Sequence, residues 1–561
     1  MLSNGFAAGQ AFFILLCAGV LTIPVALLLL WRYGRAVERE MAVASQAAMD
    51  TPTAFQPQSN HSLLPLLMQE LDVTAEVASD TYTRARLSLR NAVLVYATAG
   101  LAYALPFAIA WSYQADGALL AWRRITLLAG VQYWPTVIAI SVIAATSRIE
   151  RARIFLWLFG ALAAFSVYEL AISPDLTVAQ ILKLWLVTNG PATLLVTPLL
   201  FRRVRAIAPL VLAFLLVIIT GALLFASAIL LPHQGMVWAV NIGSALGLSG
   251  GAIFYAVHAL GLALFAIPAW WLLRYFGSLY RRKRISDQSI MIDSLYFIFA
   301  FEQSLVLAAH GQTPFLVIGL ISFAAYKVVK LFGFRLLRRT RVERAPVLLL
   351  LRVFALQARS ERLFDSLTKW WRRAGSLVMI AGPDLIRSTI QPHELLEFVG
   401  GKVARQFVAN PAQLSTQVAG IDLLPDPDGR YRINQFFCHR DSWQATMHEL
   451  AQRSSVVLMD LRSFSVRNQG CIYELGELLN SVDLRRVVFL VDSTTDRAFL
   501  KQTLDQLWQQ VGSDSPNAAA QPTVRLFAGS FDTGAQFRHL VQRLVAPAPA
   551  SPVADKVRAP P

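Results

Sequence analysis

Charged residues and cysteine are both scarce in this sequence. Aspartate, glutamate, lysine and arginine make up 15% of its 561 residues, whereas hydrophobic residues make up 55%. This balance excludes an ordinary soluble protein, because the apolar residues must face something other than one compact core. The three cysteines, Cys17, Cys438 and Cys471, are dispersed and form no CxxC pair. They support neither a disulfide framework nor a zinc site.

Acidic residues are also outnumbered by basic ones, 35 against 51, which gives a formal charge of +16. Such a charge is typical of nucleic-acid-binding proteins, but the arginines here cluster where apolar blocks end. They do not form patches interleaved with aromatic residues. We therefore attribute them to membrane topology and expect no nucleic-acid partner.

The apolar residues come in blocks of about twenty, long enough to cross a hydrocarbon layer ~30 Å thick. The block 6–31 is too long for a signal peptide and has no basic residue before it, so we interpret it as a first transmembrane helix. Nine helices are predicted, and the lipid bilayer is the first expected partner. The predicted spans are 6–31, 91–112, 125–147, 154–172, 178–200, 207–231, 250–274, 289–309 and 313–333.

Basic residues lie at alternate ends of these spans. They include Arg32, Arg35 and Arg39, the run Arg281, Arg282, Lys283 and Arg284, and five arginines between 335 and 344. The opposite loops hold little beyond Arg123 and Arg124. The positive-inside rule then places the N-terminus outside the cell and residues 334–561 in the cytoplasm. We expect the membrane to be a bacterial plasma membrane. The stretch 235–249 is interfacial, re-entrant or part of a tenth span.

Ionisable residues inside the predicted spans are costly in hydrocarbon and are candidates for transport chemistry. They are Glu169, His258, Asp293 and Glu302. Most of them are also explained by a structural role, because Glu169 and Asp293 lie near helix ends and His258 can be a neutral, hydrogen-bonded histidine in the bundle. Glu302, between Phe301 and Gln303 in mid-span, fits that explanation least well. A channel or transporter with an accessory domain is therefore one alternative function, although no inverted repeat or pair of broken helices supports it.

The chain outside the predicted spans has two parts. The loop 33–89 is expected to be a linker followed by an amphipathic or surface helix, because LLPLLMQELDVTAEVASDTYTRARLSLR has helical spacing of apolar residues. After a basic linker at 334–345, short apolar runs alternate with helical patterns over 346–545. The tail 546–561 is expected to be disordered.

The alternation over 346–545 predicts right-handed βαβ units and a parallel, flavodoxin-like sheet covered on both faces. The predicted strands are 347–356, 376–382, 455–461, 485–492 and 523–529. Ser360 is a candidate N-cap for the first helix of this domain. The segment 383–453 carries two further helical patterns with a turn, PDPDGR, between them.

The stretch DLRSFSVRNQGCIYELGE, residues 460–477, is the leading candidate site. If the strand order is 2-1-3-4-5, ligands collect at the carboxyl ends of the first and third strands, where Asp460 lies. Asn468 and Gly470 suit a tight entry into a helix, with Asn468 able to cap it.

A helical wheel places the apolar side chains of this helix on one arc that packs on the sheet. They are Cys471, Ile472, Leu475, Leu478 and Leu479, with Glu474 at the border and Tyr473 and Glu477 pointing away. A border carboxylate is partly desolvated, which raises its pKa and suits it to nucleophilic or acid–base work. Glu477 is expected to be plain surface.

This stretch resembles the strand–loop–helix signature of the nucleoside deoxyribosyltransferase-like and TIR-like superfamily. Members commonly show an aspartate-leucine strand end, a loop with Asn, and a helix opening with an aromatic residue, Glu, Leu and Gly. The spacing of Cys471 and Glu474 is similar to that in the TIR helix that carries the glutamate of NAD-cleaving members. VMIAGPD, residues 378–384, is similar to a deoxyribosyltransferase strand end, although it follows the second strand here.

The resemblance implies that Glu474 is the catalytic carboxylate, with NAD or a nucleotide as substrate and no resident cofactor. One departure is the first strand, LLRVFALQARS, where TIR domains usually carry a serine-tyrosine or serine-histidine pattern. Arg352 in this strand faces a phosphate, or else is a surface or snorkelling arginine.

Two readings of this site follow. It cleaves or transfers at an N-glycosidic bond in signalling or defence, gated by the helices or by self-association. Alternatively, it is a non-catalytic module that senses a nucleotide or associates with like domains, and Glu474 and Asp460 then only hold the structure. The FCHRD motif lacks four-ligand spacing, so no metal is predicted.

Overall fold

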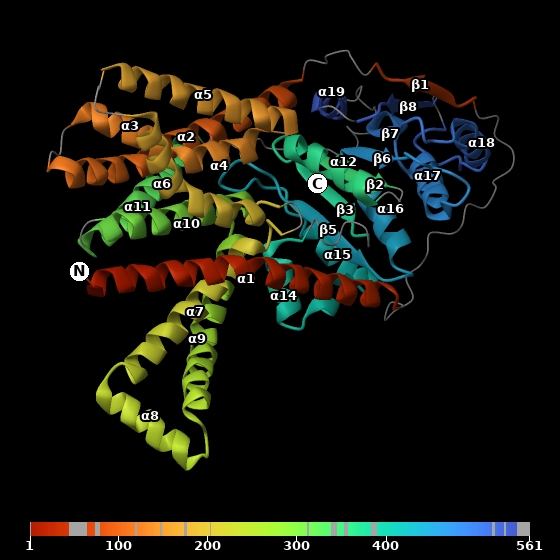
Figure 1. The fold of residues 1–561 in the computed structure, drawn as a ribbon. Helices are drawn as coiled ribbons and strands as arrows, with labels where there is room; N and C mark the ends of the chain where they lie inside the picture. The colour runs from red at the N-terminus through yellow and green to blue at the C-terminus, as the bar shows by residue number, and fades with distance from the viewer. Residues whose placement is uncertain are drawn as a thin grey trace. The chain divides into compact units, whose positions relative to one another are not determined.

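The computed structural model describes most of the chain, which forms two compact units (Figure 1). The described residues are 2–43, 64–72, 79–117, 121–145, 148–172, 177–201, 204–310, 313–337, 345–352, 357–382, 390–518, 522–531 and 534–546. The helical unit comprises Met1–Tyr33, Ala92–Leu337 and Ile390–Gly401, and the sheet unit comprises Gly34–Asn91, Arg338–Thr389 and Lys402–Pro561. The predicted tail 546–561 lies, apart from its first residue, outside the described residues.

These units do not follow the predicted division of the chain at residues 333–346. The loop between the first two long helices belongs to the sheet unit, and residues 390–401 belong to the helical unit. Short segments can join a unit far away in sequence when tertiary contacts hold them there, and such contacts leave no local pattern in the chain.

Long apolar helices make up the helical unit. They are α1 (Leu2–Met41), α2 (Asp80–Asp116), α3 (Trp122–Gln132), α4 (Trp134–Ala144), α5 (Arg148–Ile172), α6 (Val178–Leu199), α7 (Ala208–Leu230), α8 (His233–Ala245), α9 (Gly250–Arg281), α10 (Asp287–His310) and α11 (Leu316–Leu336). Each of the nine predicted spans falls on one helix or, for 125–147, on the pair α3 and α4. The first turns of α2 and the end of α1 lie in the sheet unit.

Within the described residues, seven of these helices are long and apolar enough to cross a membrane, and the pair α3–α4, bent by 43°, makes an eighth if it is one span. The predicted span 178–200 is not among them, because Lys183, Asn189 and Pro191 lower the hydropathy of α6. The ambiguous stretch 235–249 falls largely on α8, which has 13 residues. A helix of that length is too short to be a tenth span.

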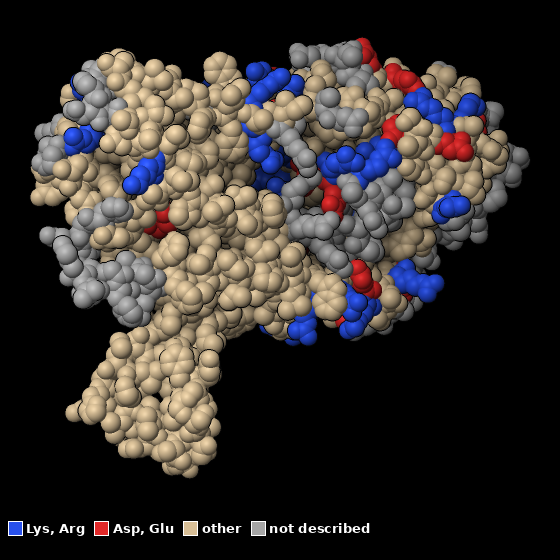
Figure 2. All heavy atoms as spheres, in the orientation of Figure 1, with Lys and Arg blue, Asp and Glu red and all other residues tan. Residues whose placement is uncertain are grey.

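Helices α7 and α9 pack closely along each other and are joined by α8 (Figure 1). A Cβ added at Gly261 would lie 2.9 Å from the Cα of Ala222, so only glycine permits this approach. The outer surface of the three helices is apolar, with Trp238 of α8 72% exposed. Figure 2 shows no charged side chain on this part of the face it draws. Such a surface suits lipid.

Helix α14 (Pro392–Val399) lies between strands of the sheet in sequence but packs in the helical unit, against α9. The Tyr280 hydroxyl of α9 donates to Gln391 Oε1 at 2.8 Å, and its ring stacks on His393. Burial raises the pKa of Glu394 to about 8, even though its carboxylate accepts a hydrogen bond from the Gln391 N–H. Residues 390–401, which connect two strands of the sheet in sequence, therefore belong to the helical unit.

The sheet unit is a parallel sheet with helices on both faces. Its strands are β1 (Leu67–Glu70), β2 (Val347–Arg352), β3 (Ser376–Ile380), β4 (Phe407–Val408), β5 (Ile433–Cys438), β6 (Val456–Asp460), β7 (Val487–Val491) and β8 (Thr523–Ala528). Its helices are α12 (Gln357–Trp371), α15 (Pro411–Ala419), α16 (Trp443–Arg453), α17 (Gln469–Ser481), α18 (Arg497–Trp508) and α19 (Gly534–Val545). The strand order is β1-β8-β7-β6-β2-β3-β5-β4, and all pairs are parallel.

Alternate residues of the central strands supply two hydrophobic cores, one on each face. Leu349 and Leu351 of β2 face the core formed with α16, α17 and α18. Leu348 and Leu350 face the core formed with α12 and α19. A strand buried on both faces is a continuous apolar run, as VLLLL is. The five predicted strands are present in the order 2-1-3-4-5, although β2 ends at Arg352 and residues 353–356 lie outside the described residues.

The prediction missed the outer strands β1, β4 and β5. Residues 67–70, expected to be helical, pair with β8, and the Trp508 indole donates to the Leu64 carbonyl at 2.9 Å. Helix begins only at Asp80. A four-residue strand added to a sheet edge depends on its distant partner, so helical spacing of the apolar residues misled the prediction.

Candidate functional site at the carboxyl end of the sheet

The candidate site lies where β2 and β6 end side by side. Arg352 and Asp460, the last residues of these strands, are partners in the ladder. From β2 the chain continues to β3 on one side, and it later returns to β6 on the other side. This is the switch point of the sheet, the position at which open parallel sheets bind ligands. Both side chains are buried, so Arg352 is neither a surface nor a snorkelling arginine.

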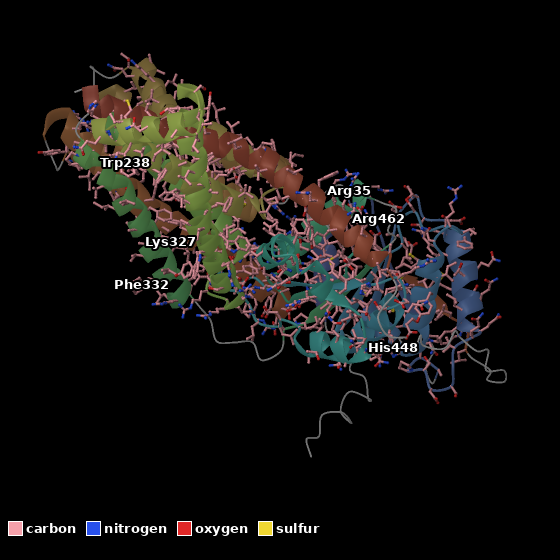
Figure 3. The ribbon with its side chains drawn as sticks, turned by 90° about the horizontal axis from the view of Figure 1, so that it is seen from below. Arg35, Trp238, Lys327, Phe332, His448 and Arg462 are labelled. Carbon is pink, nitrogen blue, oxygen red and sulfur yellow. The ribbon has the colours of Figure 1, made fainter. Side chains whose placement is uncertain are left out.

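Asp460 holds the loop that follows β6. Its two carboxylate oxygens accept hydrogen bonds from Arg462 Nε at 2.8 Å and Nη2 at 2.7 Å. The guanidinium of Arg462 also lies over the ring of Phe531, 5.7 Å from its centroid. A bidentate pair of this kind is strong and geometrically specific. Arg462, labelled in Figure 3, was not singled out from the sequence, although it lies two residues after Asp460.

A second arginine–aspartate pair lies at the end of β7. Arg359, from the first turn of α12, pairs with Asp492 and donates to Thr494 Oγ1 at 3.2 Å. Burial raises the pKa of Asp492, but hydrogen bonds from Thr494 and the charge of Arg359 outweigh burial and hold that pKa below its usual value. Ser463, whose φ of 58° is rare for a non-glycine residue, shares a hydrogen bond with Thr494.

Glu474, on α17, differs from these acids. It is 3% exposed, and its Oε2 atom has no hydrogen-bond partner within the described residues. Burial raises its pKa to about 8, although the charge of Arg352 acts in the opposite direction. The carboxyl is therefore mainly protonated at neutral pH. It is more deeply buried than the partly desolvated position that the helical wheel predicted.

Cys471, one turn before Glu474, faces the core. Burial raises the pKa of its thiol, and the carboxylates of Glu474 and Asp460 add to the effect. Cys471 is thus a poor source of thiolate. The same electrostatic coupling shows that Cys471, Glu474, Asp460 and Arg352 share one neighbourhood.

The entry into α17 is built differently from the prediction. Asn468 does occupy the N-cap position, but its side-chain oxygen accepts from the Ser465 N–H at 2.9 Å and not from the helix. Gly470 is exposed in the first turn, and a Cβ there would meet nothing within 4 Å. Glycine is therefore not required at this position. Ser360 is not an N-cap either, because α12 begins at Gln357.

The prediction that Glu477 is plain surface is wrong. It is 4% exposed, and its carboxylate is hydrogen-bonded to Nδ1 of His448 on α16. Burial raises the pKa of Glu477, but this bond outweighs burial and lowers that pKa. The same bond raises the pKa of His448, which burial alone would lower. Tyr473 is half-buried, with its ring against Trp443. A helical wheel of α17 alone cannot show that α16 covers its outer side.

No side chains in the described part of the chain come together as a group of three or more His, Cys, Asp or Glu that could hold a metal ion. Nδ1 of His439, in the FCHRD motif, lies 3.0 Å from the backbone carbonyl of Glu40. The Asp384 end of VMIAGPD lies outside the described residues.

No protein-family model, curated protein or solved structure matches this chain. The resemblance to the TIR-like and deoxyribosyltransferase-like superfamily therefore stays a prediction that depends on residues 460–477 and 378–384.

Proposed function

We propose that this protein is anchored in a bacterial plasma membrane and that the carboxyl end of its cytoplasmic, TIR-like sheet acts on NAD or a nucleotide. One observation carries the proposal. Glu474 is buried near the switch point with one carboxyl oxygen that has no partner in the described residues, whereas Asp460 and Asp492, at the ends of β6 and β7, are paired with arginines. A perturbed carboxyl at a switch point is a strong candidate for acid–base chemistry.

The chemistry is cleavage of an N-glycosidic bond. With a neutral nucleobase, protonated Glu474 donates its proton to the departing base while the bond to the sugar breaks, and the carboxylate left behind stabilises the positive charge on the sugar. Water then adds to that sugar carbon and gives a proton back to Glu474. With NAD, nicotinamide leaves as a neutral molecule without a proton, so the ionised form of Glu474 acts there by stabilising the sugar cation and accepting the proton of the attacking water. Arg352 stabilises that carboxylate. Arg359, one third exposed at the start of α12, supplies a cation for phosphate where the helix N-terminus also favours an anion.

A second function, sensing without turnover, uses the same site. Asp460 and Glu474 are both almost fully buried, so a ligand reaches them only if the side chains that cover them rearrange. Such a rearrangement would couple ligand binding to the conformation of the sheet unit. In this second function the domain also associates with like domains.

The topology of the sheet supports the proposed orientation. Strand β1 comes from the loop between α1 and α2, and it pairs with β8 near the C-terminus. That loop and the C-terminal strands must therefore lie on the same side of the membrane, and the chain must cross an even number of times from α2 to α11. Six of the seven unbroken candidate spans follow α1. Two segments are then left to assign, the bent pair α3–α4 and helix α6. Either both of them cross the membrane or neither does.

If both cross, the total is the nine spans that the apolar blocks predict, with the N-terminus on the opposite side from the sheet. The arginine-rich loop ends then lie on the side of the sheet, which the positive-inside rule identifies as the cytoplasm.

The test uses the full-length protein in detergent with NAD, AMP and a nucleoside, and it measures the released base by chromatography. Glu474→Gln should lower turnover by a factor of about 10²–10⁴, the usual contribution of a positioned acid. Asp505→Asn, which changes a half-exposed acid on α18, is the matched control. Glu477→Gln is unsuitable because Glu477 bonds His448.

A ligand-dependent shift in melting temperature without turnover would support sensing and reject catalysis. The absence of both a shift and turnover with all three compounds would reject both functions.

A further inference from the structure

Glu302 is a buried acid of the helical unit. It is 0% exposed on α10, and neither of its carboxylate oxygens has a hydrogen-bond partner in the described part of the chain. A carboxylate buried without a partner is costly, and more so at a depth where the surroundings are hydrocarbon. The group is therefore stable there only as the neutral acid, with a proton attached.

The next residue, Gln303, is the centre of a buried polar network that joins four helices. Its amide accepts from the Tyr103 hydroxyl of α2 at 2.7 Å and donates to Asn189 Oδ1 of α6 at 3.3 Å. Asn189 in turn donates to the Val131 carbonyl of α3 at 3.1 Å. Polar side chains from α2, α6 and α10 and a backbone carbonyl of α3 thus meet around Gln303, the residue after Glu302.

Several polar atoms of the same unit have no hydrogen-bond partner among the residues that the structure describes. They are both ends of the fully buried amide of Gln132, next to Val131, and the Ser304 hydroxyl on α10. Unpaired buried polar atoms in native proteins usually mark positions of internal water. The polar centre around Gln303 therefore has the groups needed to bind water and to exchange a proton.

A second polar centre lies on the same helix, nine residues from Glu302, or ~13 Å along α10. Asp293 is paired with Lys330 and Lys327 of α11, the second at 2.6 Å. The Tyr326 hydroxyl donates to Asp293 at 2.8 Å. Lys327 is labelled in Figure 3.

Three buried tyrosines connect the two centres. The ring of Tyr326 stacks on Tyr296, with centroids 3.9 Å apart, and Tyr296 meets Tyr103 edge to face at 5.1 Å. Tyr326 bonds Asp293 at one end, and Tyr103 bonds Gln303 at the other. The Tyr296 hydroxyl donates to Thr136 of α4 at 2.8 Å. Ring contacts therefore connect Tyr326, which bonds the ion pair, with Tyr103, which bonds Gln303, the residue after Glu302.

From this arrangement we propose that the helical unit carries a proton relay in which Glu302 is the proton-binding carboxyl and the Asp293–Lys330 pair is the other end. In each transfer the O–H bond of Glu302 breaks and its proton passes through internal water to the carboxylate of Asp293, which then releases it to solvent water. The Glu302 carboxylate takes a proton from water on the opposite side, which restores the acid. No electrons are exchanged. The ionisable groups on the route are Glu302, Asp293, Lys327, Lys330 and the three tyrosines. The relay does not depend on the nucleotide chemistry proposed for the sheet unit.

The first experiment labels the full-length protein in lipid vesicles with a hydrophobic carbodiimide, which adds across the O–H of a protonated carboxylic acid. Mass spectrometry should find the adduct on Glu302 and not on the ion-paired Asp293. Glu302→Asp should keep the label and Glu302→Gln should lose it. Absence of the adduct from Glu302, or its suppression by Na⁺ at constant pH, would overturn the proposal in favour of packing or of a bound metal cation.

The second experiment measures proton flux into the same vesicles with a pH-sensitive dye under an imposed gradient. Glu302→Gln should lower the flux about a hundredfold, as expected when a positioned proton donor is lost. Glu302→Asp should restore most of it, because the carboxyl is kept. Equal flux in wild type and Glu302→Gln, or no flux above that of empty vesicles, would overturn the proposal.

Discussion

The sheet unit and the helical unit each contain buried acids of two kinds. In the sheet unit Asp460 is paired with Arg462, whereas Glu474 keeps a free oxygen. In the helical unit Asp293 is paired with Lys330, whereas Glu302 has no hydrogen-bond partner within the described ranges. The paired acids have the geometry of structural groups, because removal of either partner leaves a buried charge. The unpaired acids neutralise no buried positive charge, so we assign the proton-transfer chemistry to them.

The largest effect should come from breaking the pair in the sheet unit. Asp460→Asn leaves Arg462 buried without a counter-charge, and it should lower the free energy of unfolding by about 3–5 kcal/mol. Hydrogen exchange at β6 and β7 in the full-length protein would measure the change. Asp505→Asn should change the same quantity by less than about 0.5 kcal/mol, because its partner Lys501 is exposed. Similar losses in the two variants would refute the structural role of Asp460.

The equivalent pair in the helical unit should show a slightly smaller effect. Asp293→Asn should destabilise the protein by about 3 kcal/mol, because Lys330 is buried and loses its charged partner. Glu302→Gln should be neutral or stabilising, because it replaces one neutral polar group by another. The temperature at which the detergent-solubilised protein loses its monodisperse gel-filtration peak would rank the two variants. If Glu302→Gln were the less stable of the two variants, the assignment of a structural role to the paired acid and not to the unpaired one would be wrong.

Glu474 should make the stability of the sheet unit depend on pH. Its pKa of about 8 in the fold is raised above its ordinary value, so the folded state holds a proton that the unfolded chain releases. This contribution is complete at low pH and is lost as the pH rises through about 8. Wild type should lose about 2 kcal/mol relative to Glu474→Gln between pH 6 and pH 8. Parallel curves for the two proteins in denaturant titrations would show that Glu474 is ionised in the fold.

The smallest effect concerns the pair that the sequence did not reveal. Glu477→Gln removes the bond that raises the pKa of His448, so that pKa should fall toward its ordinary value. Because the pKa of His448 is raised in the fold, its protonated ring stabilises the folded state at low pH. This stabilisation is lost as the pH rises through the raised pKa. His448 is one third exposed, so the stability change should be only about 0.5–1 kcal/mol. NMR titration of the His448 ring would detect it, and an unchanged pKa would contradict the contact.

The elements that were predicted correctly are those whose pattern is local. VVLMD and VVFLV are continuous apolar runs, and Cys471, Leu475, Leu478 and Leu479 repeat at helical spacing, so β6, β7 and the buried face of α17 follow from the residues themselves. The position of Glu474 next to that face followed for the same reason.

The elements that were missed depend on partners far away in sequence. Strand β1 exists because β8 offers an edge, Glu477 is buried because α16 covers it, and α14 packs on α9 although it lies between two strands of the sheet. The residues of these segments are compatible with other structures, and tertiary contacts decide among them. A single sequence does not display such contacts.

Strand β1 also constrains the order in which this protein can be made. It is synthesised soon after the first helix, yet its partner β8 is the last of the described strands to be synthesised. The edge of the sheet can therefore close only after every helix between them has been produced, and a fragment that starts at residue 346 would leave the edge of β8 exposed. An open edge of this kind recruits strands from other chains, so expression of the isolated domain should favour aggregation.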